Sequence, residues 1–218
     1  MDPSQYRPRV IDELVEQYLQ AFGAICIEGP KWCGKTWTAH MHAKSAFLVS
    51  DPAGNFQNRQ LAQLDPSIVL DGQFPRLIDE WQEVPSLWDA VRFKVDDQAV
   101  KGQFILTGSA TPKRRGVMHS GTGRIARLRM MSMSLYESGD STGFISLKDI
   151  CNSVYETKLT GEVQLRTIAA LILRGGWPGS IGLSTKNAVL IPRMYLKNVV
   201  DDDVDKIDDT KRDKAKMR

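Results

Sequence analysis

Residues 29–36 read GPKWCGKT, which satisfies the pattern G-x-x-x-x-G-K-[ST] of a phosphate-binding P-loop in full. A short apolar run, residues 24–27, precedes this loop, and residues 35–43 behind it contain neither glycine nor proline. Buried parallel strands are typically continuous apolar runs, and a segment without helix breakers can form a helix. We therefore expect a strand, a phosphate loop and a helix in that order, with the helix N-terminus facing the phosphates.

The residue types in this loop suit a nucleoside triphosphate. Gly29 and Gly34 let the backbone bend so that successive N–H groups point into one anion-sized hollow. Lys35 would place its charge on the β- and γ-phosphates, and the Thr36 hydroxyl could ligate Mg²⁺. The residues expected to line the nucleotide are Gly29, Pro30, Lys31, Trp32, Cys33, Gly34, Lys35, Thr36 and Trp37.

The rest of the chain alternates between apolar runs and segments of helical periodicity. Helices are predicted at residues 10–22, 55–64 and 87–100, and candidate strands at 46–49, 68–70, 77–78 and 103–107. Strands separated by helices favour a mostly parallel sheet covered on both faces. The expected fold class is therefore α/β, a three-layer P-loop sandwich followed by a small helical segment.

A nucleotide site of this kind also needs a carboxylate at the end of a neighbouring strand. Two positions compete: Asp71 after residues 68–70, and the pair Asp79 and Glu80 after residues 77–78. In the pair, Asp79 would serve the metal and Glu80 would polarise the attacking water. Thr107, at the end of the following strand, would lie on the same edge and could orient that water or sense the γ-phosphate.

Composition excludes several classes of protein. With 218 residues, 42% apolar residues and a net charge of +3, the chain has an ordinary soluble composition. No apolar stretch reaches membrane-spanning length, and the start of the chain lacks the apolar core of a signal peptide. Three cysteines make neither a disulfide framework nor a CxxC metal pair, so we expect a reducing, cytoplasmic location.

Five segments occur here in the order seen in one family: GPKWCGKT, PRLIDEWQEV, FILTGSA, GTGRIARLR and LRGGWP. The chain thereby resembles the prokaryotic AAA-type ATP-binding proteins that carry a C-terminal domain of unknown function. The resemblance implies an ATPase that converts ATP to ADP and phosphate with Mg²⁺. It also implies Asp79 as the metal-site acid, Glu80 as the water-activating acid, and Thr107 or Ser109 as the sensor.

The resemblance also predicts the domain organisation. We expect an ATPase domain over residues 1–140 and a helical lid, or the start of a second domain, over 141–200. Residues 201–218 contain seven acids and six bases and predict a charged, mobile tail. Relatives usually continue into a second domain, so this chain is expected to hold little or none of it. A nucleotide-dependent switch with little turnover and a small-acceptor phosphotransferase remain alternatives.

A basic stretch follows the predicted sensor strand, because no acid occurs between Gln98 and Tyr136. Arg124 matches a Gly-Arg of the resembled family, and we expect it to stabilise transition-state charge, either within its own subunit or in a neighbour of a homo-oligomer. Arg114 and Arg115 could instead contact nucleic acid phosphates. No aromatic residue lies between Phe104 and Tyr136 to stack on bases, so nucleic acid binding lacks further support.

Overall fold

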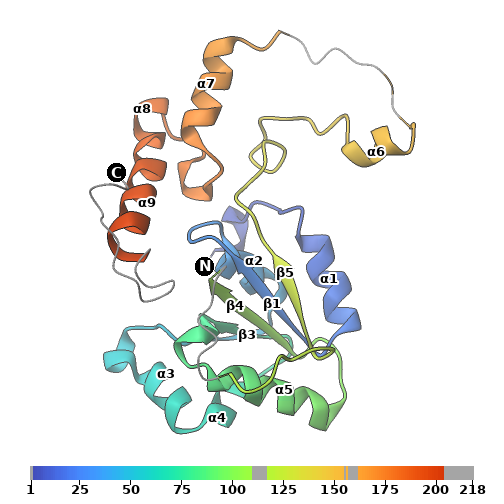
Figure 1. The fold of residues 1–218 in the computed structure, drawn as a ribbon, viewed down its shortest axis with the longest axis vertical. Helices are drawn as coiled ribbons and strands as arrows, with labels where there is room; N and C mark the ends of the chain where they lie inside the picture. The colour runs from blue at the N-terminus through green and yellow to red at the C-terminus, as the bar shows by residue number, and fades with distance from the viewer. Residues whose placement is uncertain (1, 110–116, 155, 157–161, 204–218) are drawn as a thin grey trace. The chain divides into compact units, whose positions relative to one another are not determined.

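The computed structural model describes residues 2–109, 117–154, 156 and 162–203. The chain divides into two compact units, unit 1 (Met1–Met131) and unit 2 (Ser132–Arg218). Unit 1 holds the sheet, whereas the regular structure in the described part of unit 2 is helical (Figure 1). The charged tail from residue 204 onward, and Lys113, Arg114 and Arg115 of the basic stretch, lie outside the described residues.

Unit 1 is built on a five-stranded parallel sheet in the order β2-β3-β4-β1-β5. Its strands are β1 (Ala24–Gly29), β2 (Ser45–Leu48), β3 (Arg76–Asp79), β4 (Phe104–Ser109) and β5 (Ile125–Arg129). The central strand β1 starts with Ala24 opposite Phe104 and Ile125, and it ends with Gly29 opposite Ser109. Because the strands are parallel, their carboxyl ends share one side of the sheet, named here the carboxyl edge; the opposite side is the amino edge.

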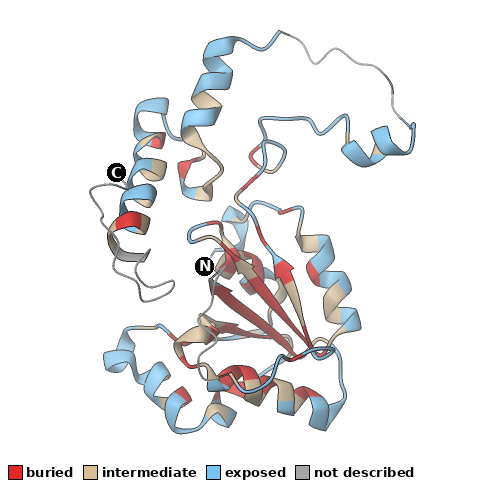
Figure 2. Cartoon of the chain, viewed as in Figure 1, coloured by how far each residue is buried: buried red, intermediate tan, exposed pale blue. Residues whose placement is uncertain are grey.

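Helices cover both faces of this sheet. Unit 1 contains α1 (Asp12–Ala21), α2 (Lys35–His42), α3 (Ala53–Leu64), α4 (Pro66–Leu70), α5 (Ser86–Gln98) and the 3₁₀ turns η1 (Pro3–Gln5) and η2 (Trp81–Glu83). Alternate side chains of β1 point to opposite faces, so Ile25 and Ile27 join one core cluster with α1 and α2. Ala24 and Cys26 join the other cluster, with α3, α4, η2 and α5. Figure 2 shows the buried sheet between exposed helix surfaces, and the predicted α/β class is confirmed.

One predicted strand is wrong, because residues 68–70 belong to helix α4. Asp65 accepts a hydrogen bond from the Ser67 N–H at 2.9 Å, and Pro66 occupies the first turn. Aspartate at the N-cap followed by proline is a helix start, since proline lacks the N–H that would be unpaired there. The sequence Asp65-Pro66 therefore begins a helix as well as ending α3.

Strand β5 was absent from the sequence-based assignment. Its buried residues, Ile125 and Leu128, are three positions apart, so the strand lacks the regular alternation of buried and exposed residues. It pairs with β1 alone, and such an edge strand shows a weaker apolar signal than the central strands. Two of its five residues are arginines, so the sequence of this segment reads as a basic stretch and not as an apolar strand.

Unit 2 contains four α-helices in its described part: α6 (Leu147–Cys151), α7 (Leu165–Arg174), α8 (Thr185–Ala188) and α9 (Leu190–Asn198). Gly175 ends α7 with a φ of 68°, as expected of a glycine at that position. Near the start of the unit, the Met133 N–H donates to the Gly176 carbonyl at 2.7 Å, and Arg174 pairs with Asp140 at 2.7 Å. The rings of Trp177 and Tyr195 lie 4.9 Å apart.

Candidate phosphate-binding site

The loop of residues 29–36 connects β1 to α2 at the carboxyl edge, as predicted. A Cβ on Gly29 would overlap the Met130 carbonyl oxygen, so only glycine allows this close approach of the backbones. Gly34 has a φ of 103°, which a side chain would strain. A side chain is thus sterically disfavoured at both glycine positions of the pattern. Helix α2 presents its N-terminal N–H groups at the end of the loop.

The lysine of the loop is folded back over its backbone. The Lys35 side chain is nearly buried, and its Nζ donates to the carbonyl oxygens of Gly29 at 3.1 Å and Pro30 at 2.9 Å. Two neutral carbonyls satisfy the ammonium without neutralising it. A phosphate oxygen carries negative charge and can therefore replace one of these partners with a gain in Coulomb energy.

The other loop side chains differ in exposure. Lys31 and Trp32 are exposed, whereas Pro30 and Trp37 are partly buried. Cys33 is fully buried and packs in the core cluster with Ile25 and Ile27, so its side chain faces the core and only its backbone can contribute to an anion site.

Three elements bring oxygen ligands together beside the loop. Thr36 at the start of α2 donates its hydroxyl to Asp79 Oδ1 at 2.8 Å, and Thr107 of β4 donates to the same oxygen at 2.5 Å. Asp79 ends β3, the strand next to β4. One carboxylate and a hydroxyl, completed by phosphates and water, are the ligand set that Mg²⁺ prefers in nucleotide sites. These residues therefore fit the ion that the sequence implies.

Glu80 follows Asp79 in an unusual conformation. Its φ is 56°, in the left-handed region, and its N–H donates to the Thr107 hydroxyl at 3.1 Å. Burial raises the pKa of the Glu80 carboxyl above its ordinary value, while a hydrogen bond donated by the Gln82 side-chain amide acts in the opposite direction. A carboxylate with a raised pKa beside a phosphate site is suited to accept a proton from water.

Gln82 was not singled out from the sequence. Its Nε2 donates to Glu80, while its Oε1 is buried and has no hydrogen-bond partner among the described residues. Gly108 of β4 makes room for it, because a Cβ there would lie 2.8 Å from Gln82 Oε1 and 2.9 Å from Trp81 Nε1. The close packing of a glutamine against a strand glycine is a tertiary contact that the sequence pattern does not reveal.

The competing carboxylate, Asp71, lies elsewhere. It caps the C-terminus of α4, and its neighbour Gly72 lies against the side chains of Arg76 and Ser45, which begin β3 and β2. Asp71 is therefore at the amino edge. Of the two competing positions, Asp79 and Glu80 lie beside the loop and Asp71 does not.

Arg124 is also at the amino edge. Its carbonyl accepts the Ala24 N–H at the beginning of β1, and its side chain pairs with Asp96 at 2.7 Å. β1 has six residues, so at about 3.3 Å per residue roughly 17 Å separates its ends. Arg124 is thus not brought to the loop of its own chain, and its action on a neighbouring subunit stays a prediction.

The other described arginines of the basic stretch lie on β5. Arg127 pairs with Glu28 at 2.9 Å and stacks 4.7 Å from the ring centroid of Trp88. Arg129 is the last residue of β5 and is exposed. The Arg127 charge is therefore already matched within unit 1.

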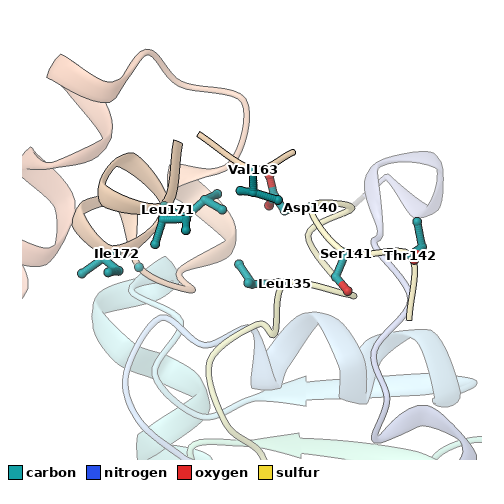
Figure 3. Close-up of a pocket in the computed structure, with 9 residues that line it drawn as sticks. Leu135, Asp140, Ser141, Thr142, Val163, Leu171 and Ile172 are labelled. Carbon is teal, nitrogen blue, oxygen red and sulfur yellow. The ribbon is translucent and has the colours of Figure 1, made fainter. Parts of the chain in front are cut away.

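Unit 2 has an open hollow of about 530 Å³ (Figure 3). Its apolar walls come mainly from α7 and the segments before it: Leu135, Val163, Ile168, Leu171 and Ile172. Asp140 is the acid in its lining, and it is paired with Arg174. Ser141 and Thr142 complete the polar part of the lining.

Comparison with known proteins identifies the family of the chain. A family model described as an AAA domain matches residues 21–139, more than half of the chain. Two uncharacterized proteins, Rv2008c of Mycobacterium tuberculosis and Mb2031c of Mycobacterium bovis, are each 30% identical to it over 120 residues. The match covers 54% of this chain but only 27% of each relative, so the chain spans about a quarter of their length.

Among solved structures, the chain is similar to the AAA domain of FIGL-1, determined in complex with ADP. The match has a TM-score of 0.38 and 15% sequence identity and covers 90% of this chain and 67% of the other. No helix in the part of the chain that the structure describes is both long and apolar enough to cross a membrane.

Proposed function

Because the chain belongs to the AAA domain family, we propose that it binds Mg-ATP at the carboxyl edge of unit 1 and hydrolyses it to ADP and phosphate. The observation that carries the proposal is the meeting of Thr36, Asp79 and Thr107 at one carboxylate oxygen beside Lys35. Hydroxyl, carboxylate and ammonium are the groups that a metal-bound triphosphate requires.

Each residue has a distinct role in this proposal. Lys35 exchanges its carbonyl partners for phosphate oxygens, and Thr36 and Asp79 hold Mg²⁺, which neutralises charge on the phosphates. Glu80 accepts a proton from the attacking water, and Thr107 fixes the positions of Asp79 and Glu80 through its two hydrogen bonds. An arginine of a neighbouring subunit, Arg124, adds charge in the transition state. A helical lid in unit 2 and a cytoplasmic location stay predictions from the sequence.

Three variants test the proposal together. Lys35→Ala should weaken Mg-ATP binding about tenfold or more, because hydrogen bonds to charged groups contribute about 1.5–3 kcal/mol each. Glu80→Gln should bind Mg-ATP and lose turnover. Asp71→Asn, the matched control at the amino edge, should change neither quantity.

Calorimetry measures the binding and phosphate release measures the turnover. Equal affinity in wild type and Lys35→Ala would contradict the nucleotide site. Turnover that survives Glu80→Gln but is lost in Asp71→Asn would reverse the assignment of the acids. Transfer of labelled γ-phosphate to an acceptor other than water would identify a phosphotransferase instead.

A further inference from the structure

A buried arginine from outside the loop contacts the loop backbone. Arg9 precedes α1, and its side chain is almost fully buried in unit 1. Its Nη1 donates to the Cys33 carbonyl oxygen at 2.7 Å, and its Nη2 donates to the Met131 carbonyl oxygen at 2.9 Å. Arg7, two residues earlier, is exposed.

The segment that carries Arg9 is fixed at several points. The Arg9 N–H donates to Asp12 Oδ2 at 2.7 Å, and the Tyr6 hydroxyl donates to Asp12 Oδ1 at 2.7 Å. The same hydroxyl lies 3.0 Å from Thr38 Oγ1 on α2. The segment that carries Arg9 is therefore held in place from both α1 and α2.

Peptide geometry makes the contact with Cys33 consequential. In a planar trans peptide the C=O of one residue and the N–H of the next point in opposite directions. When Arg9 holds the Cys33 carbonyl on the protein side, the Gly34 N–H must point the other way. Gly34, with a φ of 103°, is free of the Cβ that would oppose this orientation.

We propose that Arg9 is a positioning residue of the phosphate loop, which fixes the Cys33–Gly34 peptide so that the Gly34 N–H faces a bound phosphate. This inference rests on the proposed function, because it assumes that the loop binds ATP. Arg9 itself does not touch the nucleotide. Its effect is to hold the unoccupied loop in the conformation that binds.

The second contact anchors the guanidinium to the sheet. The Met130 N–H donates to the Glu28 carbonyl at 2.7 Å, which extends the pairing of β5 with β1 to the start of the loop. Arg9 binds the next carbonyl, that of Met131. Residues 130–131 therefore hold the end of β1 at Glu28 and, through Arg9, the loop at Cys33. A planar fork with several donors can hold two carbonyls in this way, whereas a lysine presents one point charge.

Binding kinetics give the sharpest test. If Arg9 only pre-organises the loop, Arg9→Gln lowers the fraction of molecules that are competent to bind. Stopped-flow measurement with Mg-ATP should then show an association rate constant about tenfold lower, with the dissociation rate constant nearly unchanged. Arg9→Lys should lie between wild type and Arg9→Gln, and Arg7→Ala, the matched control, should equal wild type.

The outcomes separate this inference from the proposed function. A wild-type protein that does not bind Mg-ATP overturns both. A wild type that binds, with an Arg9→Gln association rate equal to it, overturns the role of Arg9 alone. A change confined to the dissociation rate also overturns it, because it indicates direct contact with the nucleotide. Thermal unfolding curves identify a temperature at which all variants are folded, and the kinetics are measured there. If Arg9→Gln does not fold, Arg9→Lys replaces it: a lower association rate constant than wild type supports the role of Arg9, and an equal one overturns it.

Discussion

At the scale of single residues, Glu80 combines a strained backbone with a carboxyl group of perturbed acidity. Its left-handed φ and the hydrogen bond from its N–H to the Thr107 hydroxyl fix its backbone. The hydrogen bond from the Gln82 side-chain amide holds its carboxylate. A non-glycine residue in this region costs of order 1–3 kcal/mol, and such strain is found most often at functional sites. The conformation of Glu80 therefore agrees with the role proposed for it.

The acidity of Glu80 leads to a prediction about pH. A general base works only when it is ionised, and burial raises the pKa of this carboxyl. Turnover should therefore fall with decreasing pH at a higher pH than an ordinary glutamate would give. Gln82→Leu removes a donor that favours the ionised form, so the acid limb of the pH–rate profile should move to still higher pH.

Gln17→Leu is the control for that experiment, because Gln17 is an exposed glutamine on α1. Its acid limb should coincide with that of wild type. An unmoved limb in Gln82→Leu, with turnover otherwise retained, would show that another group sets the acid limb.

At the scale of secondary-structure elements, β4 supplies both Thr107 and the space for η2. A Cβ at position 108 would come within 3 Å of polar atoms of Gln82 and Trp81, and both of these side chains are held by their surroundings. Gly108→Ala should therefore lower the free energy of unfolding by about 1–3 kcal/mol, as overpacking does. It should also reduce turnover, because the shift displaces the partner of Glu80.

Denaturant unfolding measures this effect. Gly179→Ala is the matched control, since a Cβ there meets no atom within 4 Å and its φ is not in the left-handed range. It should leave stability within a few tenths of a kcal/mol. Equal stability of Gly108→Ala and wild type would mean that η2 is not closely packed on β4.

Sequence reasoning succeeded where a local pattern determines the element. The strand before the loop and the helix after it follow from a short apolar run and from glycine spacing. The preference for Asp79 and Glu80 over Asp71 came from the family resemblance. It did not distinguish the start of α4 from a strand, because Asp65-Pro66 both ends one helix and begins the next. It also missed Gln82 and the contact of Arg9 with the loop, because these contacts join residues through the folded backbone rather than through a motif.

At the scale of the whole molecule, the position of Arg124 leads to a prediction about the assembly of several copies of the chain. The amino-edge position leaves its own loop out of reach, so any catalytic role requires a second subunit. Specific activity should then rise with protein concentration, and Arg124→Ala should bind Mg-ATP normally but hydrolyse it about tenfold more slowly or worse. Arg124 pairs with Asp96, so Asp96→Asn serves to separate loss of that ion pair from loss of the arginine.

The measurements are turnover against protein concentration and, in parallel, the mass of the assembly by light scattering. Arg124→Ala mixed with Glu80→Gln should recover part of the activity, because each variant can supply what the other lacks. Wild-type turnover in Arg124→Ala would make Arg124 a surface residue whose role is confined to the Asp96 pair.

The order of strands in the sheet has a consequence for biosynthesis. β1 has no neighbour close to it in sequence: its partners are β4 and β5, and each pairing with β5, such as that of Glu28 with Arg129, joins residues far apart in the chain. The loop that follows β1 is therefore translated long before the strands that support it. At 5–20 residues per second, the roughly 100 intervening residues take on the order of 5–20 s. For that time the ribosome carries the complete loop sequence without the complete sheet around it, and a nascent chain stalled before residue 125, which lacks β5, should not be retained on immobilised ATP.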